Sequence, residues 1–275
     1  MKRNVLVLAS VCLYLSGLAQ TDSTGNKTDT IRIGNMTIVK SGKSSSGDGS
    51  EVFMGGRQHT LYRPPNISTN WLILDFGFTN YNDRTNYASA AAQQFAPGSS
   101  SDWFNLRTGK SVDVNIWFFI QRLNLIGHVV NLKYGLGTEL NNYRYNAPVV
   151  FTENPSTQVS YDDTRHFKKD KLAADYLTAP LMLNFNFTPH RREGFGLSLG
   201  ASAGYLYSSR QKIITSEDGK QKSHHDFDLN PWKISWIGEL QLGPVKLFGS
   251  YATQSMFKKG LNQTPYTVGI RFSNW

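Results

Sequence analysis

Two kinds of side chain in this sequence have types and spacings that could support chemistry, and the first is a set of metal ligands. The run from His224 to Asp228 reads His-His-Asp-Phe-Asp, and imidazoles and carboxylates are ordinary metal ligands. Adjacent histidines on a loop do not impose a coordination geometry, and no second cluster of His or Cys completes a site. We therefore expect no metal and no cofactor.

The second kind is a hydrolase set of Ser, His and Asp or Glu. A lipid A-modifying enzyme would hold such residues at the outer surface, near the edge of the bilayer. His166, His224 and His225 fall on predicted outer loops, but no well-placed serine accompanies them. His128 and His190 fall at predicted short turns on the opposite side. The sequence predicts a non-enzymatic protein without catalytic residues, with a lipid A-modifying enzyme as an alternative.

Eight charged side chains occupy alternate positions of predicted strands. Isolated buried charges are costly, so we expect these to pair in the interior of the fold and to fill it rather than leave a pore. A catalytic pair of carboxylates is the alternative, although nothing pairs the acids with a nucleophile. The residues are Asp75, Asp113, Glu139, Glu239, Lys133, Lys233, Lys246 and Arg271.

The predicted outer loops are basic, and the chain carries a formal charge of +9. Such residues could pair with the phosphates of lipopolysaccharide, and the alternative is ordinary solvated loop charge. The expected partners are outer-membrane lipids including lipopolysaccharide, and a periplasmic or outer-membrane protein, but no nucleic acid. The basic loop residues are Arg165, His166, Lys168, Lys169, Lys171, Arg210, Lys212, Lys220, Lys222, Lys258 and Lys259.

The elements that must position these groups are eight segments in which apolar and polar residues alternate, the pattern of half-buried strands. The alternation places Leu72 and Ile120 on apolar faces and Trp71 and Phe119 on polar faces. Pro180 lacks an N–H group, so a bulge is expected there. The segments are 71–81, 105–123, 129–145, 172–188, 195–210, 232–242, 245–251 and 266–272.

The connections between these segments are alternately long and short. We expect the long ones, 82–102, 147–171 and 211–231 among them, to be polar loops, with a helical turn near 88–92. An even number of strands with short turns on one side and long loops on the other is typical of outer-membrane barrels. Only 18% of the residues are charged and 13% are aromatic, which favours the same fold. A soluble lipocalin-type barrel is the alternative, with its apolar residues inside.

The N-terminal part has a different composition. Residues 1–19 have a basic start, an apolar run and a small-x-small site, which predicts a signal peptide that contains the only cysteine, Cys12. Residues 20–68 form an expected flexible periplasmic arm. Within it, the alternating runs 30–33 and 36–39 flank Gly34-Asn35, a hairpin signal. Residues 69–275 form the barrel, so the predicted fold is all-β: an eight-stranded antiparallel transmembrane β-barrel with an N-terminal periplasmic arm.

Four short motifs carry a resemblance to a known family. From residue 70 to residue 275, the chain resembles the PorT-like outer-membrane β-barrel family of Bacteroidota, whose namesake is implicated in secretion by the type IX system. The resemblance implies a barrel domain, and an accessory role in secretion or envelope assembly. The motifs are Asp175-Tyr176-Leu177-Thr178-Ala179-Pro180-Leu181-Met182-Leu183, Leu132-Lys133-Tyr134-Gly135-Leu136-Gly137, the Gly200 to Tyr205 strand and the arm run from Asp29 to Asn35.

The function expected from these features is that of an integral outer-membrane β-barrel protein with a structural or partner-binding role. An accessory of protein secretion or envelope assembly is the second hypothesis. The expected location is the outer membrane of a Gram-negative bacterium. Both the N-terminal arm and the C-terminus are expected on the periplasmic side, because short turns and chain ends share one side of such barrels.

Overall fold

A computed structural model describes residues 29–33, 36–40, 64–153, 156–191 and 194–273. The chain divides into two compact units, residues 1–60 and residues 61–275. In the first unit, strands β1 (Asp29–Ile33) and β2 (Met36–Lys40) pair antiparallel, with Ile33 opposite Met36. The expected signal peptide and most of the predicted linker lie outside the described residues.

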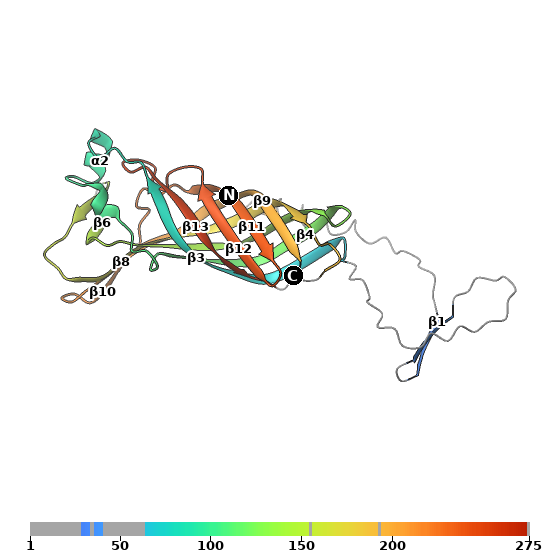
Figure 1. Ribbon diagram of the computed structural model, residues 1–275. Coiled ribbons are helices and arrows are strands. Elements are labelled where there is room, and N and C mark those ends of the chain that lie inside the picture. The colour runs from blue at the N-terminus through green and yellow to red at the C-terminus, as the bar shows by residue number, and fades with distance from the viewer. Residues whose placement is uncertain (1–28, 34–35, 41–63, 154–155, 192–193, 274–275) are drawn as a thin grey trace, which may run out of the picture. The chain divides into compact units, whose positions relative to one another are not determined.

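The second unit contains an antiparallel barrel whose eight strands close into a ring (Figure 1). Strand β3 pairs with β4 on one side and with β13 on the other, so the first and last strands of the barrel meet. The predicted all-β, eight-stranded fold is confirmed. The strands are β3 (Ile67–Asp83), β4 (Val112–Ile126), β5 (Val130–Arg144), β8 (Phe167–Asn186), β9 (Phe195–Thr215), β11 (Trp232–Leu242), β12 (Val245–Ala252) and β13 (Gln263–Phe272).

An apolar belt covers the outside of the barrel. Its side chains are exposed, while the charged side chains that these strands carry at the level of the belt are buried inside. This is the reverse of a soluble barrel and suits a wall that contacts lipid. Representative belt residues are Leu74, Phe76, Phe78, Leu177, Leu181, Leu183, Leu199, Tyr205, Ile234, Trp236, Val268, Ile270 and Phe272.

The alternation changes phase near one end of β3 and β4. Leu72 has a positive φ of 54°, and neither Leu72 nor Phe118 has a partner in the β3–β4 ladder. This irregularity turns Trp71 outward, where it is 66% exposed and its ring lies 5.8 Å from that of Phe119. It also turns Ile120 inward, where it is 1% exposed. The predicted faces of Trp71, Phe119 and Ile120 were therefore wrong, because a bulge adds a residue that strict alternation does not anticipate.

Pro180 does not cause the bulge that its missing N–H suggested. It lies in register opposite Ser202 of β9, and the β8–β9 register shifts lie elsewhere, at Asp175/Tyr176 and Phe167/Lys169. On the β5 side, the ladder has a gap at Ala179 and Pro180 but resumes in the same register. The missing donor therefore removes pairing on one side of β8 without inserting a residue.

The two ends of the barrel differ. The end with the short connections at Gly127, residues 187–194 and Gly243 is called the turn end, and Gly127 and Gly243 have the positive φ that tight turns require. The other end is called the loop end. It carries α2 (Ala90–Phe95), η1 (Ser101–Phe104), the β6 (Val149–Glu153) and β7 (Thr157–Tyr161) hairpin, and β10 (Lys220–Ser223).

The long connections at the loop end are more ordered than the polar loops that the sequence predicts. The predicted loop 147–171 contains the β6–β7 hairpin and the start of β8. Strand β9 continues to Thr215 and pairs with β10, both within the predicted loop 211–231. Conversely, residues 105–111 were predicted as strand but contribute only an isolated bridge from Leu106 to Tyr145, because the turn at Gly109 precedes β4.

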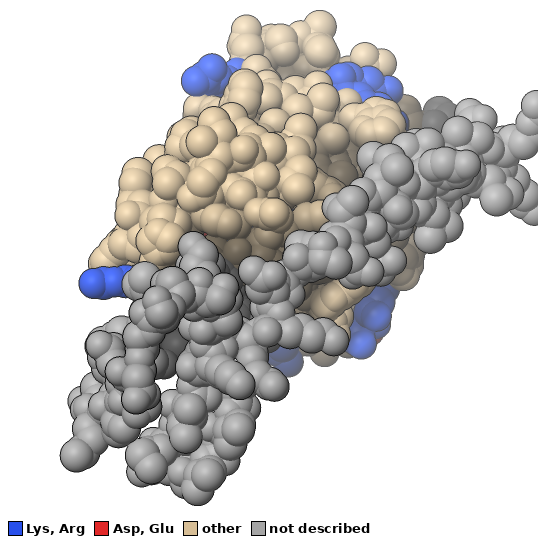
Figure 2. Space-filling model, turned by 90° about the vertical axis from the view of Figure 1, so that its right-hand side faces the viewer, with Lys and Arg blue, Asp and Glu red and all other residues tan. Residues whose placement is uncertain are grey.

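Charges are unevenly distributed over the described surface. Seen from the turn end, basic side chains appear at the edges and no Asp or Glu is visible among the described residues (Figure 2). None of the helices in the described part of the chain combines the length and apolarity needed to cross a membrane.

Close packing between β8 and β9 yields a prediction about two glycines. A Cβ atom on Gly200 would lie 2.0 Å from the carbonyl oxygen of Leu181, whereas a Cβ on Gly238 would make only ordinary contacts, at 3.5 Å to the Leu199 side chain and 3.8 Å to the carbonyl oxygen of Ser198. Gly200→Ala should therefore lower the free energy of unfolding by about 1–3 kcal/mol. Gly238→Ala, the matched control, should change it by less than about 0.5 kcal/mol. Urea unfolding in lipid vesicles measures both, and equal effects would contradict the packing argument.

Candidate functional site

The centre of the barrel interior is an ion pair between its first and last strands. Arg271 of β13 lies directly opposite Asp75 of β3 in the ladder that closes the ring. Its Nε donates to Asp75 Oδ1 at 2.8 Å and its Nη2 to Oδ2 at 2.7 Å, a bidentate arrangement. Trp117 of β4 donates its Nε1–H to the same carboxylate at 2.7 Å. One carboxylate thus joins three neighbouring strands.

The pair extends across the interior to other strands. Arg271 Nη1 donates to Glu239 of β11 at 2.5 Å, and Lys133 of β5 donates to the other oxygen of Glu239 at 2.7 Å. A second pair joins Lys233 Nζ to Glu139 at 2.8 Å. The predicted pairing of interior charges is confirmed for these residues.

The two remaining predicted charges also lie in the interior. Lys246 donates to Ser273 Oγ at 2.5 Å, and Asp113 is buried with one oxygen that has no hydrogen-bond partner in the described structure. A serine also belongs to the network, because the Ser198 hydroxyl of β9 accepts from Lys133 at 3.1 Å and from Asn184 at 3.0 Å. The interior therefore has the chemistry of a structural network.

Large side chains fill the space around the network. The guanidinium of Arg271 lies over the rings of Trp117 and Phe248, at 5.6 and 6.0 Å from their centroids. Phe248 in turn packs against two glycines, because a Cβ on Gly77 or Gly269 would come within 3.0 Å of its ring. A cavity of about 20 Å³ beside these groups has room for roughly one water molecule. The described interior is thus packed at this level.

A hydrophobic cap closes the loop end. Phe151 of the hairpin stacks on Phe257 with 6.2 Å between the ring centroids. Phe95 of α2 meets Phe257 edge-on, with 5.5 Å between the centroids. The sequence placed these apolar residues in polar loops, and their burial explains why the loops are ordered. The cap cluster includes Phe95, Phe104, Tyr145, Val149, Phe151, Val159, Leu172, Phe227, Leu229, Met256, Phe257 and Leu261.

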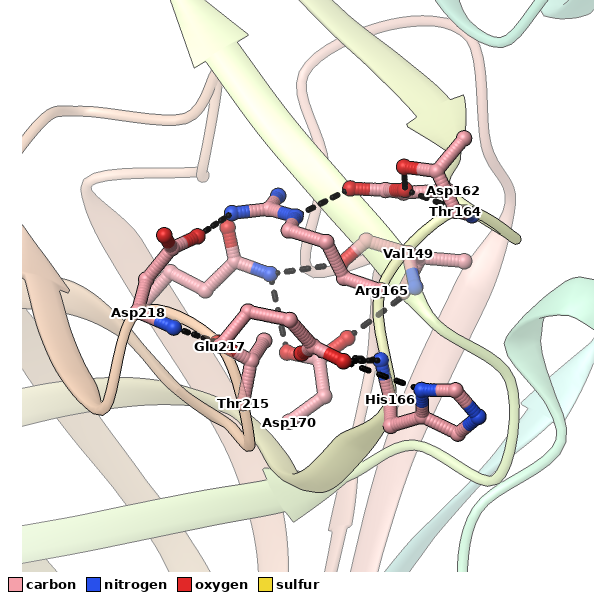
Figure 3. Close-up of polar contacts among 10 residues, drawn as sticks. Val149, Asp162, Thr164, Arg165, His166, Asp170, Thr215, Glu217 and Asp218 are labelled. Atoms are coloured by element: carbon pink, nitrogen blue, oxygen red, sulfur yellow. Dashed lines mark hydrogen bonds and ion pairs between the residues drawn. The ribbon is translucent and has the colours of Figure 1, made fainter.

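Two polar side chains hold the β6–β7 hairpin against the barrel wall (Figure 3). Gln211 of β9 donates to the carbonyl of Val149 at 2.8 Å and accepts from the N–H of Phe151 at 3.0 Å. Asp170 of β8 accepts from the N–H of Val149 at 3.1 Å and from Gln211 at 2.9 Å. The Gln211 amide therefore provides β6 with the backbone hydrogen bonds that a neighbouring strand would otherwise make. Its position in a predicted loop did not indicate this role.

A second polar group joins the start of β8 to the β9–β10 turn (Figure 3). Arg165 donates to Asp162 at 2.6 Å and to Asp218 at 3.0 Å, and His166 Nδ1 lies 2.9 Å from Glu217. These contacts are partly or fully exposed, so each is worth little alone. Arg165 and His166 are thus structural ties and not a free anion site.

The residues of the His224 to Asp228 run, which the sequence analysis considered as metal ligands and rejected, have separate partners in the structure. His225 lies 3.0 Å from Glu153, Asp226 pairs with Lys258 and Asp228 with Lys259. Within the part of the chain that the structure describes, no group of three or more His, Cys, Asp or Glu side chains could hold a metal ion.

Ser209, His225 and Glu153 have the residue types of a hydrolase triad and lie near one another, which the sequence did not reveal. Glu153 contacts Nδ1 of His225, as the orienting acid of a triad would. Ser209, however, donates its hydroxyl to the main-chain carbonyl of His225 at 2.5 Å. A nucleophile needs its hydrogen bond to the imidazole, so this arrangement holds a loop and does not activate the serine. His128 and His190 lie in the short connections of the turn end, at the other end of the barrel from this group.

The comparison with known protein families agrees with this geometry. Residues 74–262 match the family model described as outer membrane protein beta-barrel domain, which is more than half of the chain. The chain belongs to this family. It is therefore an integral outer-membrane protein, as the apolar belt and the closed ring of strands independently require. No curated protein matches the chain.

The buried carboxyl that holds the hairpin leads to a pH prediction. Asp170 lies outside the apolar belt, seven residues beyond Leu177, which is the last belt residue of β8. Burial raises the pKa of its carboxyl to about 7. The usual value is about 3.9, so between these values the folded state binds more protons than the unfolded state. Local stability of the hairpin should therefore fall as the pH rises from about 4 to about 7, by at most ~1.4 kcal/mol per pH unit, and stay constant above.

Hydrogen exchange of the hairpin amides between pH 5 and 8 measures this dependence. Asp170→Asn should remove the slope, and Asp102→Asn, an exposed control at the same end, should keep it. A slope that persists in the Asp170→Asn variant would show that another group is responsible.

Proposed function

We propose that this protein is a non-enzymatic outer-membrane barrel that serves a structural or partner-binding role. The observation that carries the proposal is the filled interior, in which Arg271, Asp75 and Glu239 are paired and packed between aromatic rings. A barrel of eight strands has an interior only wide enough for side chains. Its accessible surfaces are therefore the lipid-facing wall, the folded loop end and the N-terminal segment.

The proposed orientation places the loop end outside the cell and the turn end in the periplasm. Long loops are extracellular and short turns periplasmic in barrels of this class. The N-terminal end of β3 and the C-terminal end of β13 both lie at the turn end, where Leu74 pairs with Phe272. This supports a periplasmic location for the N-terminal segment and the C-terminus, reached after export by the expected signal peptide.

The first test is electrical. The full-length protein in a planar bilayer should give no unitary conductance steps in KCl, because charged pairs and rings fill the barrel. A porin incorporated in the same way is the positive control. Stable steps whose size scales with KCl concentration would contradict the proposal, and an altered lipid A mass spectrum in cells that express the protein would contradict its non-enzymatic part.

A second candidate function is an accessory role in secretion or envelope assembly, as the PorT-like resemblance suggests. The β1–β2 hairpin favours it, because the hairpin belongs to a separate unit and a two-stranded hairpin is marginal in water without a partner.

Deletion of residues 21–50 tests the accessory role and should leave the barrel intact, since the barrel strands begin at Ile67. On this hypothesis the deletion impairs secretion or envelope integrity while the heat-modifiable mobility of the barrel is unchanged. Normal secretion and envelope integrity in the deletion strain would remove the support for an accessory role.

A further inference from the structure

The outward face of the sheet beyond the apolar belt carries an unusual arrangement of charge. At the loop end, β8 and β9 extend past the belt and β10 joins them, so the wall continues as a small sheet (Figure 1). The inner face of this sheet is occupied, because Leu172 and Ile213 are buried and Asp170 and Gln211 hold the hairpin. The side chains that alternate with these along β8 and β9, such as Lys171 and Lys212, point outward.

Four of these outward side chains form a row of like charge. Arg144 of β5 is the ladder partner of Lys171 in β8, Lys171 is the partner of Lys212 in β9, and Lys212 is the partner of Lys222 in β10. We call these four residues the basic row. Direct ladder partners have Cβ atoms about 5 Å apart, so the row places four positive charges side by side over roughly 15 Å. Lys169 and Lys220 flank Ile214 on the same face.

None of the four row residues forms an ion pair with a described carboxylate, and the nearby Asp175, whose charge acts to raise the pKa of Lys171, is paired with Arg210. Lys171 donates to the amide oxygen of Asn142 at 2.5 Å, while Lys212 and Lys222 take part in no described ion pair. Arg144 donates Nη2 to the carbonyl of Lys168, and its buried Nε has no hydrogen-bond partner. The nearby Arg210 differs, because it is paired with Asp175.

This arrangement costs the folded protein stability. Like charges directly opposite each other on neighbouring strands are destabilising. Partial burial, together with Lys169, Arg210 and Lys212, lowers the pKa of the Lys171 ammonium to about 8. Partial burial and the neighbouring lysines also lower the pKa of Lys212. A self-repelling row that forms no ion pair of its own within the described residues suits a ligand that supplies several negative charges.

The position of the row selects the kind of anion. Lys171 lies six residues beyond Leu177, the last belt residue of β8, which is roughly 20 Å along a tilted strand. The exposed rings of Tyr205 and Trp232, 5.1 Å apart, mark the edge of the belt on the neighbouring strands. A glycolipid whose acyl chains contact the belt would extend its headgroup along this same wall.

We propose that the basic row binds the anionic headgroup of lipopolysaccharide in the outer leaflet, through its phosphate and carboxylate groups. The proposal rests on the proposed function, since it requires the loop end to face outward. A soluble polyanion offers the same charges, but it would have no reason to bind beside a lipid-facing belt.

The test compares the full-length protein in neutral detergent with two triple variants. The row variant is Lys171→Gln, Lys212→Gln and Lys222→Gln. The control variant is Lys110→Gln, Lys258→Gln and Lys259→Gln, which removes the same charge from other loop-end positions. Binding of rough-type lipopolysaccharide to the immobilised proteins should weaken about 10- to 100-fold in the row variant. The reason is that each of the three substituted lysines loses roughly one favourable contact with the anionic headgroup. The control should change less than about threefold.

Two further probes identify the source of the anion. Soluble polyphosphate and phosphatidylglycerol vesicles are measured at matched phosphate concentration. Weak binding of both, relative to lipopolysaccharide, supports the proposal. Equal lipopolysaccharide binding by the row variant and the unmodified protein would overturn it. Tighter binding of polyphosphate would overturn the lipid assignment, and equal binding of phosphatidylglycerol would overturn the preference for lipopolysaccharide.

Folding and orientation are checked separately. Heat-modifiable mobility shows whether each variant forms the barrel, and the double variant Lys212→Gln, Lys222→Gln replaces the row variant if that one does not fold. In a Cys12→Ser background, Thr108→Cys at the loop end should react with an impermeant maleimide in intact cells. Arg191→Cys at the turn end should react only after permeabilisation. The reverse labelling would refute the proposed orientation while the detergent measurement still reports on binding, so the two failures are distinguishable.

Discussion

The rest of the barrel depends on the ion pair between Arg271 and Asp75. These residues are ladder partners on the first and last strands, so their contact forms where the ring closes. Removing one partner of a buried pair typically costs about 3–5 kcal/mol, because the other charge remains without compensation. The buried pair is stable here because Glu239 and Trp117 bond to its remaining donors and acceptors, and Lys133 in turn pairs with Glu239. The same network lets the outer wall be apolar at the level of the belt, since there the strands direct their charges inward.

A second constraint acts at the loop end, where the backbone leaves the barrel ladder and still needs hydrogen-bond partners. Gln211 and Asp170 provide them for the β6–β7 hairpin, and the aromatic residues Phe151, Phe257 and Phe95 bury the apolar side of the loops. The loop end is therefore a folded cap. Within it, His225, Asp226 and Asp228 each contact a different charged side chain.

The outer wall changes character along single strands. On β8, exposed leucines give way to Lys171 and Lys169, and on β9 tyrosines give way to Arg210 and Lys212. The transition follows the environment expected at the edge of a bilayer, where hydrocarbon ends and charged headgroups begin. The basic row and the apolar belt are parts of one continuous surface.

The sequence by itself determined the class of fold and the composition of the interior. Alternation with a period of two is a local property, so it located eight strands and assigned Asp75, Glu239 and Arg271 to the same side of the wall. The predicted signal peptide and the low content of charged residues suggested the membrane. The resemblance to an outer-membrane barrel family pointed the same way, and the family match confirmed that class.

Only the tertiary structure decided which of these residues meet. The bulge at Leu72 and Phe118 reversed the faces of Trp71 and Ile120, because register depends on contacts between strands and not on the pattern within one strand. The pairing of Arg271 with Asp75 required ring closure between segments nearly 200 residues apart. The alignment of Arg144, Lys171, Lys212 and Lys222 likewise exists only once four strands are in register, since their spacing along the chain has no period that would reveal it.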